Sequence, residues 1–413
     1  MKVSVPFYLF VLVFLCLHIP GYAQNAADLI QPISAKKKKP IPNEKDLGDL
    51  AKGVFHHMGK PLIPEKGKEI YFSFLPLAIT PPGGGNALIT STSAGFYMGA
   101  RENTYLSTAS FAPYWNFGSQ FGLPLRANVW LNKNIGLLDA DIRFLFYPQY
   151  TWGLGNGKAE SQKLLINYKY LRTYFTAYKR IKPFLYLGLG FNMDYHIHIS
   201  TSDSSLQTYS GYAYGTVEGS NSISMSPNLD FLYDHRYAFS DMLPISYIHF
   251  IYRQNLFKTQ GASTNWSSVF LDVRKYFYLT NNPQEQNILA LRTFLWNTMG
   301  NTTPYLDLPS IGWDPYDRSG RGIQQNRYRG KSLIYFEAEY RKDITRNGLL
   351  GFVSFVNINS ALEPSSGKFE TFHPGLGSGL RIKVSKVTKT NLAIDYAFSN
   401  DYSGIWLALG EAF

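Results

Sequence analysis

The stretch FLYLGLGFNMDYHIHIS, residues 184–200, carries the strongest structural signal in the sequence. Apolar side chains alternate with polar or small ones along it, which is the pattern of a β-strand with one apolar face. The run covers about 16 residues, whereas strands of globular sheets usually have about five or six. This length predicts a tilted, membrane-spanning strand. The apolar row comprises Leu185, Leu187, Leu189, Phe191, Met193, Tyr195, Ile197 and Ile199, and the other row comprises Tyr186, Gly188, Gly190, Asn192, Asp194, His196, His198 and Ser200.

The same alternation recurs at residues 123–131, 138–146 and 391–398. Alternation alone does not separate a soluble sheet from a membrane sheet. The polar rows, however, contain Asp and Arg, and burying such charges unpaired in an apolar core costs several kcal/mol. Short turns also alternate with long polar loops at residues 201–225 and 300–331, as they do in outer-membrane barrels.

Composition favours the membrane alternative. Charged residues make up 17% of the chain, below the typical ~25%. Aromatic residues reach 16% because the chain has 30 Tyr and 29 Phe, and a lipid-facing barrel needs them for its apolar band and aromatic girdles. We therefore predict an all-β fold, a closed transmembrane antiparallel β-barrel of about 16 strands (roughly 14–16), over residues 69–413.

The first residues predict export. Lys2 precedes an apolar run and the small residues Gly21 and Ala23, which is the order of a secretory signal peptide. We expect cleavage after Ala23, so that residues 1–23 are the signal peptide, residues 24–68 a largely irregular periplasmic tether, and the location the outer membrane of a Gram-negative cell. The single cysteine, Cys16, would be removed with the signal peptide. The net charge of +11 could indicate a nucleic-acid partner, but export argues against one.

Four segments carry motifs in a characteristic order. Residues 150–156 read YTWGLGN, and residues 287–313 hold a Leu-Ala strand followed by Pro-aromatic-x-x-Leu-Pro. Residues 318–341, RSGRGIQQNRYRGKSLIYFEAEYR, join an Arg-Gly loop to a Glu-Tyr-Arg strand, and residues 375–413 read as closing strands with a terminal Phe. Together they resemble the BamA/TamA-like family of outer-membrane proteins (bacterial surface antigen), particularly its barrel-only members from Bacteroidetes.

The sequence departs from that family's pattern at three places. Ile323 follows Arg321-Gly322 where the family usually has an aromatic residue, and a Tyr-Asp-x-Arg-Asp-Asn element is reduced to YRQN at residues 252–255. The segment at residues 24–68 is too short for even one of the POTRA modules that the family's assembly machines carry. These departures weigh on whether the protein works as an assembly machine, and they leave the expected fold unchanged.

The resemblance implies that the long extracellular loop folds into the lumen, where its arginine meets acidic residues. Independently, the alternation directs Glu337, Glu339 and Asp395 inward. We therefore expect Arg321 to be clamped by Glu337, Glu339 or Asp395, with Gly322 permitting close approach of the backbone. The alternative is an outward loop, with the lumenal charges satisfied by water.

Other candidate sites carry less weight. Phe413 resembles the terminal aromatic of a barrel-assembly signal, and a plain closing strand is the alternative. His196 and His198 share a row and could present two imidazoles to a metal, but no third ligand is evident beyond Asp194, which favours polar filling of the lumen. No Gly-x-Ser-x-Gly, His-Glu-x-x-His or phosphate-loop motif occurs. We expect no enzyme activity, no metal and no cofactor.

Three functions remain open. The first is BamA/TamA-like assistance to the insertion or translocation of protein or lipid, through a weak seam between the first and last strands. The second is a passive pore for small solutes, gated by the long loop. The third is a surface or structural protein whose loops bind an external partner. Expected partners are outer-membrane lipids, the barrel-assembly machinery during biogenesis, and a periplasmic or membrane protein.

Overall fold

The computed structural model describes residues 44–49, 70–79, 87–116, 118, 120–156, 158–202, 204–236, 245–256, 266–280, 286–315, 319–385 and 390–413. The predicted signal peptide (1–23) lies outside these ranges, as does the predicted tether (24–68) apart from residues 44–49, of which 47–49 are helical. The described strands all belong to one compact unit, which spans residues 35–413. No helix in the described ranges is long and apolar enough to cross a membrane.

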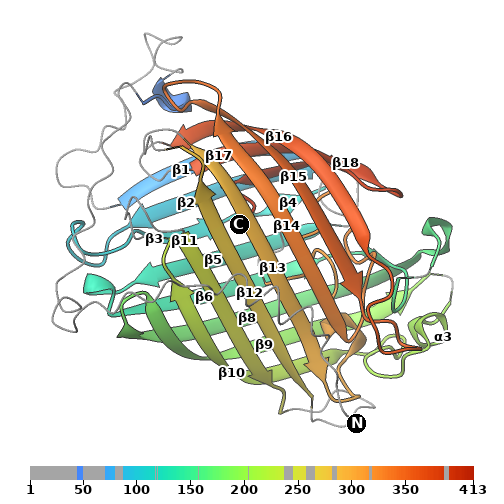
Figure 1. Cartoon of the computed structure of the whole chain (residues 1–413). Helices are drawn as coiled ribbons and strands as arrows, with labels where there is room; N and C mark the ends of the chain where they lie inside the picture. Colours follow the sequence, from blue (N-terminus) through green and yellow to red (C-terminus); the bar gives the residue numbers. More distant parts are fainter. Residues whose placement is uncertain are drawn as a thin grey trace. The chain divides into compact units, whose positions relative to one another are not determined.

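In the described part of the chain, strand segments that follow one another pair antiparallel in one 18-stranded sheet (Figure 1). Short helical segments lie between some of them: η2 (Asn132–Asn134), η3 (Glu160–Gln162), α3 (Leu206–Ser210) and η4 (Tyr305–Asp307). The strands are β1 (Ile70–Ile79), β2 (Ala87–Phe96), β3 (Ser107–Phe111), β4 (Tyr114–Trp115), β5 (Phe121–Trp130), β6 (Gly136–Phe146), β7 (Gln149–Thr151), β8 (Leu164–Lys182), β9 (Leu185–Thr201), β10 (Ser222–Asp234), β11 (Ile245–Gln254), β12 (Ser267–Tyr278), β13 (Asn287–Met299), β14 (Ser332–Asp343), β15 (Leu350–Ala361), β16 (His373–Ser385), β17 (Thr390–Phe398) and β18 (Ser403–Leu409).

Two pairs of these segments are interrupted single strands. β3 and β4 both lie between β2 and β5, and β6 and β7 both pair with β8. Pro113 and Pro148 stand at the two interruptions, and proline has no N–H to donate to a sheet. With each pair counted once, the 18 segments occupy 16 positions, within the range of about 14–16 expected for such a barrel.

The sheet curls into a barrel shape (Figure 1), but the prediction of a closed barrel is wrong. Within the described ranges, no strand pairing joins β1 to β18: β1 pairs with β2, and β18 pairs with β17. β18 has only seven residues and ends at Leu409. At Gly410 the backbone has a φ of +91°, which glycine adopts at little cost. The chain therefore turns away from the strand direction where further pairing would be needed.

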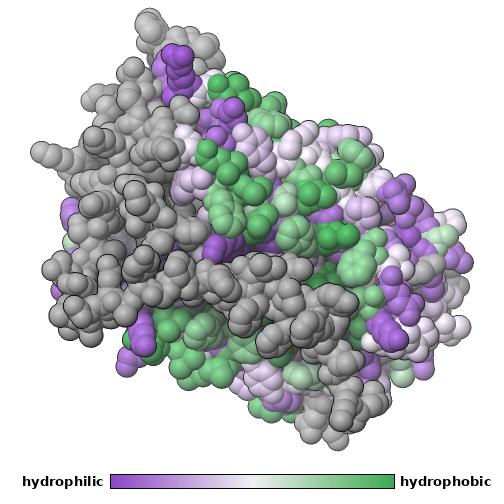
Figure 2. Space-filling model, in the orientation of Figure 1, coloured by the Kyte–Doolittle hydropathy of each residue, from purple (hydrophilic) through white to green (hydrophobic). Residues whose placement is uncertain are grey.

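The two faces of the strands differ in burial in the sense that the alternation predicts. On β9, Leu187 and Leu189 are 43% and 67% exposed, whereas Asn192 and Asp194 are 5% and 4% exposed. Figure 2 shows apolar side chains gathered along the middle of the visible face, with polar residues concentrated toward the end that carries α3. An apolar exposed face and a polar buried face invert the pattern of a soluble sheet and fit contact with lipid.

The alternation on β9 breaks near its end, so the prediction that His196 and His198 share a face is wrong. His196 is buried and His198 is exposed. His198 has a φ of +56°, and the register with β8 shifts between Asn167 and Lys169. Such a β-bulge adds one residue to a strand and sends the following side chains to the opposite face. The two imidazoles are therefore not presented together to one metal ion.

The sequence leaves the segment at residues 201–244 open, and its described residues, 201–202 and 204–236, contain both loop and strand. Ser205 caps α3 by accepting a 3.3 Å hydrogen bond from the N–H of Thr208, and β10 begins at Ser222. The loop also contacts the long loop at residues 300–331. The N–H of Tyr305 donates to the carbonyl of Tyr214 at 2.9 Å. These contacts join the two loops at one end of the strands.

Candidate functional site

The loop between β13 and β14 packs against the buried face of the sheet. Its residues Ile311, Ile323 and Tyr328 form one cluster with Phe294 and Tyr335, which come from β13 and β14. Short bridges fix its path, because Arg329 pairs with both Gly155 and Ser310. Most described residues at 303–330 are buried. The loop is thus an ordered, sheet-contacting element with an apolar core of its own.

Arg321, at the turn of this loop, contacts all three of the carboxylates expected for it. Its Nη1 donates to Oδ2 of Asp395 at 2.7 Å, and its Nε donates to Oε1 of Glu337 at 3.1 Å. Its Nη2 donates to both Glu337 and Glu339. All four side chains are buried. The guanidinium also lies 3.5 Å from the ring centroid of Phe355 on β15. The carboxylates therefore contact the edge of the guanidinium, and the Phe355 ring covers one of its faces.

The neighbouring glycine brings the loop backbone against β17. Gly322 has a φ of +87°, and a Cβ on it would lie 2.9 Å from the backbone N of Phe398. The side chain of Asn357 adds a 2.8 Å hydrogen bond from Nδ2 to the carbonyl of Arg321. Only glycine combines this φ with so short an approach. The predicted residues Arg321, Gly322, Glu337, Glu339 and Asp395 are therefore brought together at one place.

Further charges surround this clamp. Arg341 donates from Nε to Oε1 of Glu339 at 2.5 Å. Arg381 donates to Asp395 and, at 2.8 Å, to Oε2 of Glu411. Burial alone would lower the pKa of Arg321, but Glu337, Glu339 and Asp395 outweigh it and hold the pKa well above its ordinary value. Sequence reasoning missed Arg381, Glu411, Phe355 and Asn357, whereas Arg341 was detectable because it shares the phase of the two glutamates.

Phe413 does not lie on a strand, in contrast to the expectation of an aromatic on an alternating terminal strand. Beyond Gly410 the chain turns to the buried face, where the Phe413 ring packs near Tyr276, with ring centroids 6.2 Å apart. Arg341 donates from Nη2 to the carbonyl oxygen of Phe413 at 2.9 Å. Phe413 is 8% exposed. Because Arg341 also binds Glu339, the chain end is connected to the clamp through one side chain. A role of Phe413 as an assembly signal stays a prediction.

A second set of contacts fastens the loop at the α3 end of the strands. Arg327 donates from Nη2 to the carbonyl of Lys158 at 2.7 Å and to Asp401, between β17 and β18, at 3.4 Å. Tyr212 donates to the carbonyl of Thr303 at 2.7 Å. These bonds connect the long loop to three other loops. The loop is therefore held at both its arginine turn and its outer end.

These features define the class of the protein: an antiparallel β-sheet of barrel shape with a polar buried face and a large loop packed on that face. No family model matches the sequence, and no curated protein matches it. Among solved structures, the chain is similar to BamA from Haemophilus ducreyi lacking POTRA domains 1–3, with 13% identity, a TM-score of 0.50, and coverage of 83% of this chain and 69% of that chain. It is also similar to CdiB from Escherichia coli, with 11% identity, a TM-score of 0.52, and coverage of 84% and 61%.

At such low identities these likenesses show the fold. The fold is that of the BamA and CdiB barrels, in agreement with the fold that the sequence resemblance implied. This chain spans less than two thirds of the CdiB chain.

Proposed function

We propose that this chain is an integral outer-membrane β-barrel protein of the BamA/TamA-like type, and that it assists the assembly or translocation of protein or lipid without catalysing a reaction. The fold shared with BamA supports this proposal. So does the apolar exposed face, with residues such as Leu189 and Ile405 more than half exposed. The proposed partners are outer-membrane lipids, the barrel-assembly machinery, and a periplasmic or membrane protein.

The observation that carries the proposal is the junction between β1 and β18, which are not paired with each other in the described part of the chain. Unpaired N–H and C=O groups along a strand edge are a template for pairing with another chain. Inside a bilayer each unsatisfied group costs several kcal/mol. An open junction at membrane depth is therefore unstable until a strand or polar lipid groups engage it. We infer that the substrate enters here.

We further propose that the buried face of the sheet lines a lumen and that the loop at residues 303–330 is its plug. The bonds of Arg321 to Glu337, Glu339 and Asp395 would hold such a plug in place. Ile311 and Ile323 add apolar contact with the sheet. A loop fixed in this way would obstruct the flow of small solutes. This consequence disfavours the passive pore, which needs an open path.

Reconstitution tests the proposal. Liposomes with and without the chain are mixed with an unfolded outer-membrane β-barrel substrate, and the fraction that becomes protease-resistant is followed with time. A parallel assay follows transfer of a fluorescent lipid between leaflets. We expect the chain to accelerate at least one of the two processes. Equal rates with and without the chain in both assays would overturn the proposal.

A further inference from the structure

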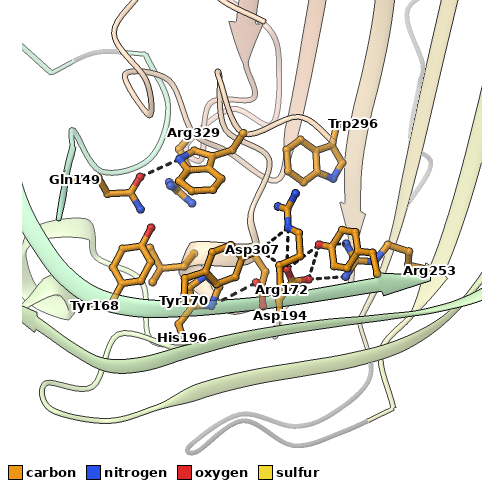
Figure 3. Close-up of a pocket in the computed structure, with 13 residues that line it drawn as sticks. Gln149, Tyr168, Tyr170, Arg172, Asp194, His196, Arg253, Trp296, Asp307 and Arg329 are labelled. Carbon is orange, nitrogen blue, oxygen red and sulfur yellow. Dashed lines mark hydrogen bonds and ion pairs between the residues drawn. The ribbon is translucent and has the colours of Figure 1, made fainter. Parts of the chain in front are cut away.

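A small polar cavity of about 30 Å³ lies between the long loop and strands β8, β9 and β11. Figure 3 shows three arginines around it: Arg172 from β8, Arg253 from β11 and Arg329 from the loop. Two carboxylates also line it, Asp194 from β9 and Asp307 from η4. The charge on this lining is therefore not balanced by its own acids, even when both are ionised.

Arg329 is the least compensated of these cations. It is 2% exposed, and its Nη1 and Nη2 donate to the carbonyl of Tyr305 at 2.8 Å and to Oδ1 of Asn326 at 2.9 Å. Its Nε–H is buried without a hydrogen-bond partner. Within the described ranges no carboxylate oxygen lies within ion-pair distance of it. A buried guanidinium held only by neutral groups is costly, because a charge in the interior needs an opposite charge.

Arg172 is also incompletely satisfied. Its Nε donates to the hydroxyl of Tyr170 at 2.8 Å, but its buried Nη1 has no hydrogen-bond partner. Its nearest carboxylate contacts are long, at 3.6 Å to Asp141 and 3.8 Å to Asp194. Asp194 is already engaged by Arg253, whose Nη2 lies 2.6 Å from Oδ2. Arg172 therefore has two long ion pairs but keeps one buried N–H, on Nη1, without a hydrogen-bond acceptor.

Asp307 carries only part of a negative charge at neutral pH. Burial, reinforced by the charge of Asp194, raises the pKa of Asp307 to about 7. It accepts a hydrogen bond from the hydroxyl of Ser224, and Nδ1 of His196 lies 3.7 Å away. Asp307 is thus partly protonated where Arg172 and Arg329 are fully charged. The deficit of negative charge at the cavity follows from the geometry and is enlarged by this protonation.

We propose that this cavity binds a small monovalent inorganic anion of the size and charge of chloride, held by Arg172 and Arg329. A volume of about 30 Å³ admits one such ion, since a site for one water needs about 10–15 Å³ by the same kind of measure. An organic phosphate or larger ligand is excluded by size. Because Arg329 belongs to the loop and Arg172 to β8, the anion joins the loop to the sheet. The charges are reversed relative to the Arg321 clamp, where carboxylates of the sheet bind a cation of the loop. The inference does not depend on the proposed function.

The test uses the full chain folded in detergent micelles in sodium gluconate, which is free of halide. Trp296 and Trp313 line the cavity, so iodide bound there should quench part of the tryptophan emission in a saturable way. Chloride should raise the thermal unfolding midpoint by about 2 °C or more over gluconate at equal ionic strength, because a ligand that binds only the folded state stabilises it. Added chloride should compete with iodide and so reduce the saturable part of the tryptophan quenching.

Arg329→Gln should remove the saturable quenching and the chloride-dependent shift. Arg236→Gln is the matched control, since Arg236 is partly exposed and pairs with Asp234 at the end of β10; it should retain both effects. Purely linear quenching, together with equal midpoints in chloride and gluconate, would overturn the proposal. Because these readings are made on the unmodified chain, they decide the matter even if Arg329→Gln fails to fold. They also leave the insertion assays of the proposed function unaffected.

Discussion

Arg321 and Asp395, which lie 74 residues apart, are joined by a 2.7 Å hydrogen bond between Nη1 and Oδ2. One partner belongs to a loop and the other to β17, the strand next to the last. The bond thus connects the long loop to the part of the sheet that adjoins the open junction. Glu337 and Glu339 on β14 share the same guanidinium, so removal of one side chain affects three carboxylates.

Arg321→Ala should destabilise the folded barrel strongly. Glu337, Glu339 and Asp395 are at most 4% exposed, and breaking a buried ion pair from one side costs about 3–5 kcal/mol. We expect the loop to become sensitive to protease and the heat-modifiability of the barrel on gels to occur at lower temperature. Arg236→Ala, which removes a partly exposed ion pair, serves as the control. Unchanged protease resistance and heat-modifiability in Arg321→Ala would contradict the clamp.

Gly322→Ala should loosen the same loop by a steric route. Its Cβ would lie 2.9 Å from the backbone of Phe398, at a φ of +87°. Gly367→Ala is the matched control, because Gly367 has a φ of +66° but nothing within 4 Å of its Cβ. Strain of φ costs about 1–3 kcal/mol at either position. Thermal unfolding should show a larger loss for Gly322→Ala, and equal losses would mean that the close approach has no energetic role.

Single-channel recordings in planar bilayers should show little conductance for the unmodified protein, because the loop and its side chains occupy the buried face. Arg321→Ala should increase the frequency of open events as the loop is released. A large, steady conductance in the unmodified protein would instead favour the passive pore. A conductance that is the same in Arg321→Ala and in the unmodified protein would show that Arg321 does not hold the loop as a gate.

Stability should fall as the pH rises from about 4 to about 7 through the titration of Asp307. Its pKa is 3.8 in an unstructured chain and about 7 in the fold. Between these values the folded state holds the proton that the unfolded state releases, so each step upward in pH disfavours folding. Asp307→Asn should abolish this part of the slope in the thermal midpoint measured against pH. A slope that is the same in Asp307→Asn would place its origin elsewhere.

Phe413→Ala should lower the thermal midpoint, because the ring is only 8% exposed and packs near Tyr276. Truncation of a buried Phe typically costs about 3–5 kcal/mol. If Phe413 is also an assembly signal, its deletion should slow insertion by the barrel-assembly machinery. Tyr396→Ala is the control, since Tyr396 is an exposed aromatic on β17. Undiminished insertion without Phe413 would limit its role to packing.

Local alternation predicted the strands and their faces well because side-chain direction in a strand depends only on its period. The inward direction of Glu337, Glu339 and Asp395 could be read in this way, and the partner Arg321 came from the family resemblance. Arg381 and Phe355 could not be assigned to the clamp, because which strands surround the loop depends on the curl of the whole sheet. The sequence around them holds no local signal for that curvature.

The failures have local physical causes. The phase change at His198 requires a left-handed backbone at a residue other than glycine, which no period-two pattern reveals. Closure depends on pairing between strands at opposite ends of the sequence, and nothing in β1 or β18 specifies that register. Gly410 offered a signal for the turn of the chain end, since its φ of +91° suits glycine, but glycine alone does not indicate direction.

The central claim, that the junction between β1 and β18 opens for substrate, is tested most directly by locking it. The sequence has one cysteine, Cys16, so cysteines placed in β1 and at Gly404 or Ala408 of β18 would introduce thiols on both sides of the junction, and the fraction joined by oxidation is measured on gels. The control is a pair at Tyr396 and Ile405, which are register partners in the β17–β18 ladder. We predict that the β1–β18 disulfide stops substrate insertion or lipid transfer in liposomes, that reductant restores it, and that the control disulfide has no effect. Undiminished activity with the β1–β18 junction fully locked would contradict the account.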